Sequence, residues 1–233
     1  MRAGQQELEF AGLKADAVVI ECDPGWRLVA WAGAQYVPCW DLGGGVLFCC
    51  EWLETNSPHD LHCYEPIMDK ALRWTRARLL ASGPARARLH WRYALADMRY
   101  RIFRGNTRAE EVYTVYPDGV AVRKLAAFPG DRSDYGGNPN FWQVAEYILI
   151  TGPGAHPDRV IRPSPAFSFS NGAGEAIRLD WPLPPQRLPL CRRFPQVGSW
   201  RRFAGCLHLA DRPQPFMAFP NARTLFPHDP CPD

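Results

Sequence analysis

A stretch at residues 85–95 could combine anion binding with acid–base chemistry. Successive side chains of a β-strand point to opposite faces, so a strand here would place Arg88, His90 and Arg92 on one face, beside Arg86. Apolar side chains would occupy the other face and belong to the core. Guanidinium groups bind carboxylates through paired hydrogen bonds, and imidazole exchanges protons near neutral pH. These residue types in this pattern favour recognition of an acidic ligand.

Three interpretations of that cationic face are open. Burying arginine without a partner is costly, so the face meets solvent, pairs with carboxylates of the same chain, or lines a groove for an anion. The chain of 233 residues has 24 Arg, 3 Lys and a formal net charge of +3. A charge this small, without a clustered basic tract, does not indicate a nucleic-acid partner.

Cleavage of a uronate-containing polysaccharide by β-elimination is the most specific chemistry that these residues support. The reaction needs a cation beside the uronate carboxylate, a base for the C5 proton and an acid for the leaving oxygen. The candidates for these three tasks are, in that order, Arg92 with Arg88 or Arg123, then His90, and then Tyr100 or Tyr113.

Two other kinds of site compete with this one. Paired carboxylates could hydrolyse a glycosidic bond, but no spacing selects a pair from the acidic candidates Glu65, Asp69, Glu110, Glu111 and Asp118. A divalent metal could bind near His59, His62 and Glu65, although their spacing resembles no established metal motif. Apart from this alternative metal site, the sequence predicts no cofactor, because it lacks a Walker loop and a dinucleotide fingerprint.

The elements that must position these residues read mostly as β-strands. Gly and Pro together make up 42 of the 233 residues, so the chain turns often. Residues 66–72 could open a short helix, and residues 73–81 fit either a helix or a strand. Residues 111–116 and 120–126 form the best predicted hairpin, around the turn Pro117-Asp118-Gly119. Further strands are expected at 17–22, 26–37, 46–53, 85–95, 100–103, 144–150, 176–181 and 205–209.

Many short strands between Gly/Pro turns predict an all-β fold, a large antiparallel β-sandwich of the supersandwich kind. Residues 1–160 are expected to form the sandwich core, and the Pro-rich, loop-rich residues 161–233 to pack on the same domain. No run of about 18 apolar residues is present, so no membrane span is predicted. The eight cysteines form no CxxC pair, which argues against a zinc ribbon.

Several blocks within residues 36–157 resemble large bacterial carbohydrate-active proteins whose β-sandwich is similar to that of polysaccharide lyases and galactose-mutarotase-like domains. In that pattern a histidine stands where this chain has Arg76, a departure that bears on activity. The resemblance covers about half of the chain. The matching blocks are YVPCW at 36–40, YEPIMDK at 64–70, PAR at 84–86, HWRYAL at 90–95, YTVYPDGVAVRK at 113–124 and GPG at 152–154.

This resemblance implies an exported or periplasmic protein that binds an acidic polysaccharide or oligosaccharide. Trp40 and Glu65 fall in the matching blocks and join Arg88, Arg92 and Arg123 as candidate substrate-binding residues. The N-terminal sequence lacks the pattern of a signal peptide, and together with the Pro-rich end this suits a fragment of a longer chain. Two alternatives stay open: a non-catalytic carbohydrate-binding or structural module of a larger exported protein, and an intracellular protein with a small-ligand pocket.

Overall fold

The described part of the chain folds mostly into antiparallel strands, which confirms the predicted all-β class. Internal contacts divide it into two units, residues 1–142 and 143–233. None of the described helices is long and apolar enough to cross a membrane. The computed structural model describes residues 1–23, 25–43, 47–49, 53, 55–56, 63–128, 130, 156–171, 174–182, 203–208 and 216–219.

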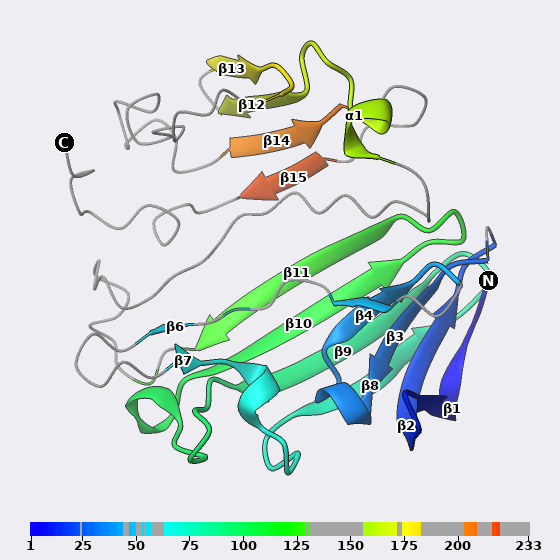
Figure 1. Cartoon of the computed structure of the whole chain (residues 1–233), viewed down its shortest axis with the longest axis vertical. Coiled ribbons are helices and arrows are strands. Elements are labelled where there is room, and N and C mark those ends of the chain that lie inside the picture. Colours follow the sequence, from blue (N-terminus) through cyan, green and yellow to red (C-terminus); the bar gives the residue numbers. More distant parts are fainter. Residues whose placement is uncertain are drawn as a thin grey trace. The chain divides into compact units, whose positions relative to one another are not determined.

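The first sheet of unit 1–142 is a meander in chain order, β1-β2-β3-β4-β5 (Figure 1). Its strands are β1 Arg2–Phe10, β2 Leu13–Glu21, β3 Arg27–Trp31, β4 Pro38–Asp41 and β5 Leu47–Cys49. The strand expected over 26–37, with a bulge or bend at Gly33, is shorter than predicted but does bend there, because a short 3₁₀ helix, Ala32–Ala34, turns the chain after β3. Gln35 and Tyr36 follow with positive φ. Gly33 lies in this bend, where a Cβ atom would collide with the Trp31 ring.

The second sheet is also a meander, with the strand order β11-β10-β9-β8. Its strands are β8 Arg76–Ser82, β9 Ala87–Ala94, β10 Arg108–Val115 and β11 Ala121–Phe128. The predicted hairpin is therefore confirmed, and residues 73–81, which fitted two structures, contribute most of a strand. Two short strands, β6 Thr55–Asn56 and β7 Cys63–Tyr64, pair with each other.

Side chains from both sheets meet in one hydrophobic cluster. Ile20 of β2 and Leu28 of β3 pack in the same group as Leu89 of β9 and Val115 of β10, and all four are fully buried. The Ser82 hydroxyl also donates a hydrogen bond to the Ala3 carbonyl, 3.5 Å away, between β8 and β1. These contacts give unit 1–142 a shared core, whereas the supersandwich arrangement itself stays a prediction.

Two local predictions need correction. Residues 100–103 are not a strand: Ile102 makes an isolated bridge with Ala96, and a 3₁₀ helix follows at Phe103–Gly105. The buried Asp97 carboxylate shapes this loop, since it accepts hydrogen bonds from the backbone N–H of Arg99 and Arg101. The helix expected at 66–72 is confirmed only as a short 3₁₀ helix, Pro66–Met68.

Unit 143–233 contains a third antiparallel sheet, of order β13-β12-β14-β15. The strands predicted at 176–181 and 205–209 are confirmed as β13 and β14, while the one predicted at 144–150 lies outside the described residues. The elements are α1 Pro157–Val160, β12 Phe167–Asn171, β13 Ala176–Leu179, β14 Phe203–Leu207 and β15 Phe216–Phe219. The expectation that residues 161–233 pack on the same domain stays a prediction.

We expect Gly119→Ala to lower the free energy of unfolding by about 2–3 kcal/mol. Gly119 has a φ of +88° in the β10–β11 turn, and an added Cβ would lie 2.7 Å from the Trp26 ring. Urea denaturation measures the loss. Gly12→Ala is the matched control, because its φ is +77° with no atom within 4 Å, and it should cost only about 1 kcal/mol. Equal losses of stability in the two variants would show that the Trp26 ring moves aside without an energetic cost.

Candidate functional site

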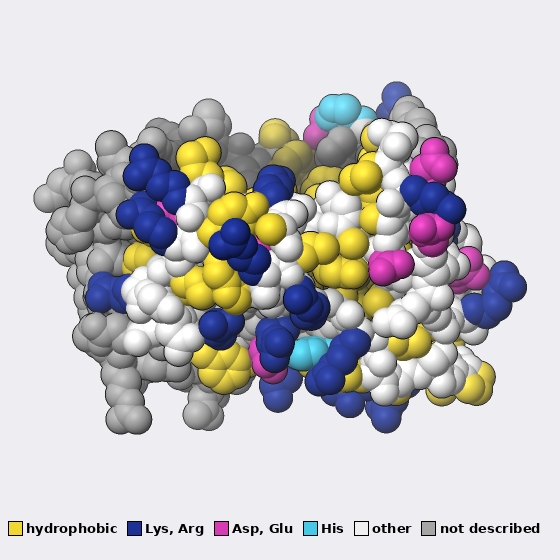
Figure 2. Space-filling view, turned by 90° about the horizontal axis from the view of Figure 1, so that it is seen from below, with side chains coloured by type: hydrophobic (Ala, Val, Ile, Leu, Met, Phe, Trp, Pro, Cys, Tyr) yellow, Lys and Arg dark blue, Asp and Glu magenta, His cyan; other side chains and the backbone are white. Residues whose placement is uncertain are grey.

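The predicted alternation along β9 is present. Leu89 and Trp91 are completely buried, whereas Arg88 and His90 are half-buried and Arg92 is exposed. The inward residues pack in the core, so the outward residues form a cationic face on the second sheet. Figure 2 shows Lys and Arg side chains grouped beside a histidine on the side turned toward the viewer. The face is therefore not sealed in the core, although His90 lies 3.4 Å from the Glu110 carboxylate; solvent, carboxylates of the same chain and an anion groove all stay open as interpretations.

Strand β8 extends the cationic face. In the register of β8 and β9, Arg76 lies directly opposite Arg92, and Arg78 lies directly opposite His90. We call Arg76, Arg78, Arg88, His90 and Arg92 the outer cationic face. Like charges directly opposite each other destabilise a sheet. Arg88 and Arg92 make no ion pair with any residue that the structure describes, so an anion on this face would relieve repulsion.

His90 already has a partner at each ring nitrogen. The Arg78 Nε donates to Nδ1 at 3.3 Å, and Glu110 Oε2 lies 3.4 Å from Nε2. With Nδ1 accepting from a guanidinium, the proton belongs on Nε2 and points toward Glu110. The imidazole side chain is only 11% exposed. His90 could remove a substrate proton only after Arg78 moves away from Nδ1.

Tyr113 and Arg123 lie on the opposite face of the sheet from His90. The register pairs His90 with Val112 and Leu89 with Tyr113, so Tyr113 points inward with Leu89. Arg123 is the partner of Tyr113 on β11 and shares its face. The structure therefore does not bring Tyr113 and Arg123 together with Arg88, His90 and Arg92. Side chains alternate between the two faces of a sheet, and these two groups occupy opposite faces.

Tyr113 and Arg123 instead surround a buried carboxylate that the sequence did not single out. Glu111 is 0% exposed and accepts hydrogen bonds from the hydroxyls of Tyr93 and Tyr113, both at 2.7 Å. The Arg123 guanidinium binds it through two hydrogen bonds, of 2.6 and 2.8 Å. The backbone N–H of Leu53 donates to the Tyr93 hydroxyl at 3.2 Å. We call Glu111, Tyr93, Tyr113 and Arg123 the Glu111 cluster.

The electrostatics of the Glu111 cluster fit a structural anchor. Burial raises the pKa of the Tyr93 hydroxyl, and the negative charge of Glu111 raises it further. Burial alone would lower the pKa of Arg123, but Tyr113 and Glu111 outweigh it and the pKa is raised. The Tyr93 hydroxyl thus stays protonated and the guanidinium stays charged. The sequence did contain a signal for this site. Glu111, Tyr113 and Val115 are alternate residues of one strand, so their side chains lie on the same, inward face.

Tyr100, the other candidate acid, lies in the loop after β9. Its φ is +59°, and its backbone N–H donates to the Asp97 carbonyl at 2.9 Å. The Arg73 guanidinium lies 4.2 Å from the centre of its ring, and the Trp74 ring centre lies 6.3 Å away. Tyr100 therefore contacts an arginine and an aromatic ring within this loop, and it lies outside the outer cationic face.

Trp40 and Glu65 occupy packing positions. Trp40 of β4 is half-buried against the shared core, opposite Leu28 and Phe48 in register. Glu65 bridges to Ala96 through its backbone N–H, at 2.9 Å, just before the 3₁₀ helix. Their predicted roles in substrate binding stay predictions.

The predicted metal alternative cannot be assembled from the described part of the chain. His59 and His62 lie outside the described residues, which leaves Glu65 alone of that set. Among the residues that the structure describes, no group of three or more His, Cys, Asp or Glu side chains could hold a metal ion.

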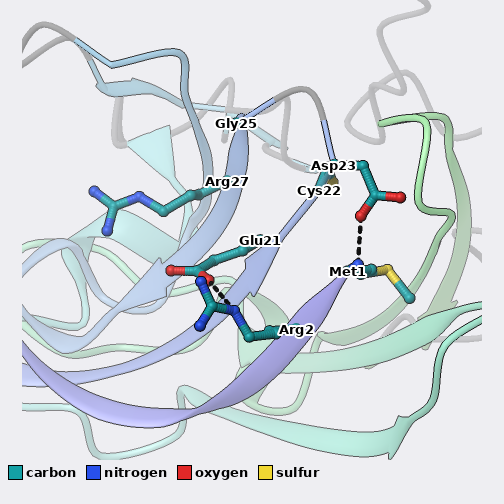
Figure 3. Close-up of a pocket in the computed structure, with 7 residues that line it drawn as sticks. All are labelled: Met1, Arg2, Glu21, Cys22, Asp23, Gly25 and Arg27. Carbon is teal, nitrogen blue, oxygen red and sulfur yellow. Dashed lines mark hydrogen bonds and ion pairs between the residues drawn. The ribbon is translucent and has the colours of Figure 1, made fainter.

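An open pocket of about 430 Å³ lies at the start of β1 and the turn between β2 and β3 (Figure 3). Each charged group that lines it has a partner of opposite charge, in the pocket or on β4. Arg2 Nε lies 3.1 Å from Glu21 Oε2, and the Met1 amino group contacts Asp23. Arg27 binds Asp41 of β4 through its Nε at 2.9 Å. A pocket whose charges are neutralised internally gives little reason for an ionic ligand to bind.

No protein-family model, curated protein or solved structure matches this chain. The resemblance to polysaccharide-lyase-like proteins therefore stays a prediction.

Proposed function

We propose that the outer cationic face of β8 and β9 binds an acidic, uronate-containing polysaccharide. The observation that carries the proposal is the cross-strand pair Arg76 and Arg92, two cations directly opposite each other beside the half-buried Arg88 and His90. A sheet surface of like charges is unfavourable by itself. A carboxylate seated between the strands would turn that repulsion into attraction.

The spacing of the positively charged side chains along β9 suits a polymer with repeated carboxylates better than a small anion. Alternate residues of a strand lie about 6.8 Å apart, and neighbouring strands about 4.8 Å apart. The two arginines of β9, Arg88 and Arg92, therefore lie about 14 Å apart along the strand. A chain of repeating acidic sugars could contact several guanidinium groups in succession, and each can hold a carboxylate through two hydrogen bonds.

Binding is better supported than cleavage. The candidate base His90 has both ring nitrogens occupied, and Tyr113 lies on the other face of the sheet. A β-elimination needs a free base and an acid within reach of the same sugar. We therefore propose a binding module, and treat cleavage as an outcome that the same experiment can detect.

The double variant Arg88→Ala/Arg92→Ala is expected to bind polygalacturonate or alginate about tenfold more weakly than the wild type, since two exposed contacts of up to about 1 kcal/mol each are lost. Isothermal titration calorimetry at low and moderate salt measures the change. The matched control is Arg2→Ala/Lys14→Ala, which removes two exposed cations from β1 and β2. It should bind like the wild type.

Equal weakening in both double variants would contradict a local site, because only the total charge would then matter. Tighter binding to single-stranded DNA than to either polysaccharide would contradict the ligand class. Ultraviolet absorbance from an unsaturated uronate product, lost in His90→Ala, would add cleavage to binding.

A further inference from the structure

Two cysteines face each other across the edge of the first sheet. Cys39 of β4 lies directly opposite Cys49 of β5, and the Sγ atoms are 3.5 Å apart, in hydrogen-bond contact and without a covalent bond. Cys39 is 3% exposed, whereas Cys49 is exposed to solvent. One thiol of the pair is therefore open to a reagent, and the other lies directly behind it.

We propose that Cys39 and Cys49 form a redox-reactive dithiol, which a hydroperoxide converts into an intrachain disulfide. Cys49 is the attacking thiol because it is exposed. Cys39 is the resolving thiol because it is sheltered and already contacts the Cys49 sulfur. This reactivity is independent of the polysaccharide site, which lies on the other sheet of unit 1–142.

The strand geometry fits a disulfide. Residues directly opposite in an antiparallel pair have Cα atoms about 4.5–5.5 Å apart, within the range of about 4.4–6.8 Å that disulfides span. The sulfur atoms need to approach from 3.5 Å to about 2.05 Å. Rotation about the side-chain bonds can supply this shift while the β4–β5 register stays unchanged.

The local environment activates the exposed thiol. The hydrogen-bond contact with the Cys39 sulfur, whose own S–H also reaches the Val37 carbonyl at 3.2 Å, lowers the pKa of Cys49 to about 7, although partial burial acts in the opposite direction. The lowered pKa increases the share of Cys49 side chains that are thiolates, the form that attacks peroxides. Cys22 is the contrast within the same sheet region, because burial raises its pKa.

The chemistry balances in two steps. The Cys49 thiolate attacks one peroxide oxygen, the O–O bond breaks, and hydroxide leaves while Cys49 becomes a sulfenic acid. The Cys39 sulfur then attacks the Cys49 sulfur, the S–O bond breaks, and the departing hydroxide takes up the Cys39 proton as water. The two thiols lose two electrons, and the two peroxide oxygens gain them. Hydrogen peroxide therefore yields one disulfide and two waters.

The test treats the full chain with one to two equivalents of hydrogen peroxide at pH 7, in a Cys50→Ser background that removes the adjacent thiol. We expect peptide mapping without reductant to show a Cys39–Cys49 link in most molecules. Two fewer thiols should react with Ellman's reagent in denaturant, and dithiothreitol should restore both. Cys22 should stay reduced throughout.

Two variants test the roles of Cys49 and Cys39 separately. Cys49→Ser changes an exposed side chain, and it should abolish the link while leaving the circular dichroism spectrum unchanged. Cys39→Ala removes the hydrogen bond, so iodoacetamide should alkylate Cys49 about fivefold more slowly at pH 7. Intermolecular dimers through Cys49, a stable Cys49 sulfenic acid, or equal oxidation of Cys22 would each overturn the proposal.

Discussion

Glu111→Ala is expected to lower the free energy of unfolding by about 3–5 kcal/mol, the range for breaking a buried ion pair by removing one partner. The substitution leaves the Arg123 guanidinium, whose side chain is 29% exposed, without its carboxylate. It also leaves the hydroxyls of Tyr93 and Tyr113 without the acceptor that both use. Urea denaturation monitored by tryptophan fluorescence measures the loss.

The neighbouring carboxylate provides a matched control for that result. Glu110 lies on the other face of β10, its side chain is 43% exposed, and among the described residues its side chain pairs only with His90, at 3.4 Å. Glu110→Ala should therefore cost less than about 1 kcal/mol. Glu111→Gln should fall between the two, because its amide offers one oxygen to donors that shared two. Similar losses for Glu110→Ala and Glu111→Ala would contradict the anchoring role of the Glu111 cluster.

Trp91→Ala is expected to lower the free energy of unfolding by about 3–5 kcal/mol, because a large buried ring is replaced by a cavity. Trp91 is completely buried on β9, and its ring lies 4.1 Å from the ring of Tyr93. Its neighbour across the sheet is Glu111, so the cavity would also open beside the buried carboxylate. Guanidinium denaturation followed by circular dichroism measures the change.

A conservative variant separates the packing of the ring from the energetic cost of burying the Trp91 N–H. The Trp91 Nε1 is buried with no acceptor among the residues that the structure describes. Trp91→Phe keeps an aromatic ring and removes that N–H, so it should lose clearly less than Trp91→Ala. Val122→Ala, at a side chain that is 55% exposed, should change stability by less than about 0.5 kcal/mol. An equal loss in both Trp91 variants would show that the ring itself contributes little.

Short-range patterns accounted for much of the fold. The hairpin of β10 and β11 and the alternation along β9 follow from strand-forming residues around clear turns. β1 was missed, because its sequence RAGQQELEF is polar at most positions and much of the strand is exposed. Residues 100–103 were wrongly assigned as a strand, because the loop there is shaped by the buried Asp97 rather than by local propensity.

The candidate site was predictable only in part. The shared face of Arg88, His90 and Arg92 could be read from one strand. The register that sets Arg76 and Arg78 against that face depends on which strands become neighbours, and no local pattern contains this information. The same register turns Tyr113 inward, where it contacts Glu111 instead of His90.

The order of strands in the sheets also bears on how fast the protein folds. In both sheets of unit 1–142, every strand pairs with the strand next to it in the sequence, so pairing closes short loops and carries a small entropic penalty. In the third sheet, β12 pairs with β14 as well as with β13. The paired residues of β12 and β14 lie 32 to 40 positions apart in the sequence. Local pairing speeds folding, so we expect the two meanders to form before the β12–β14 pairing.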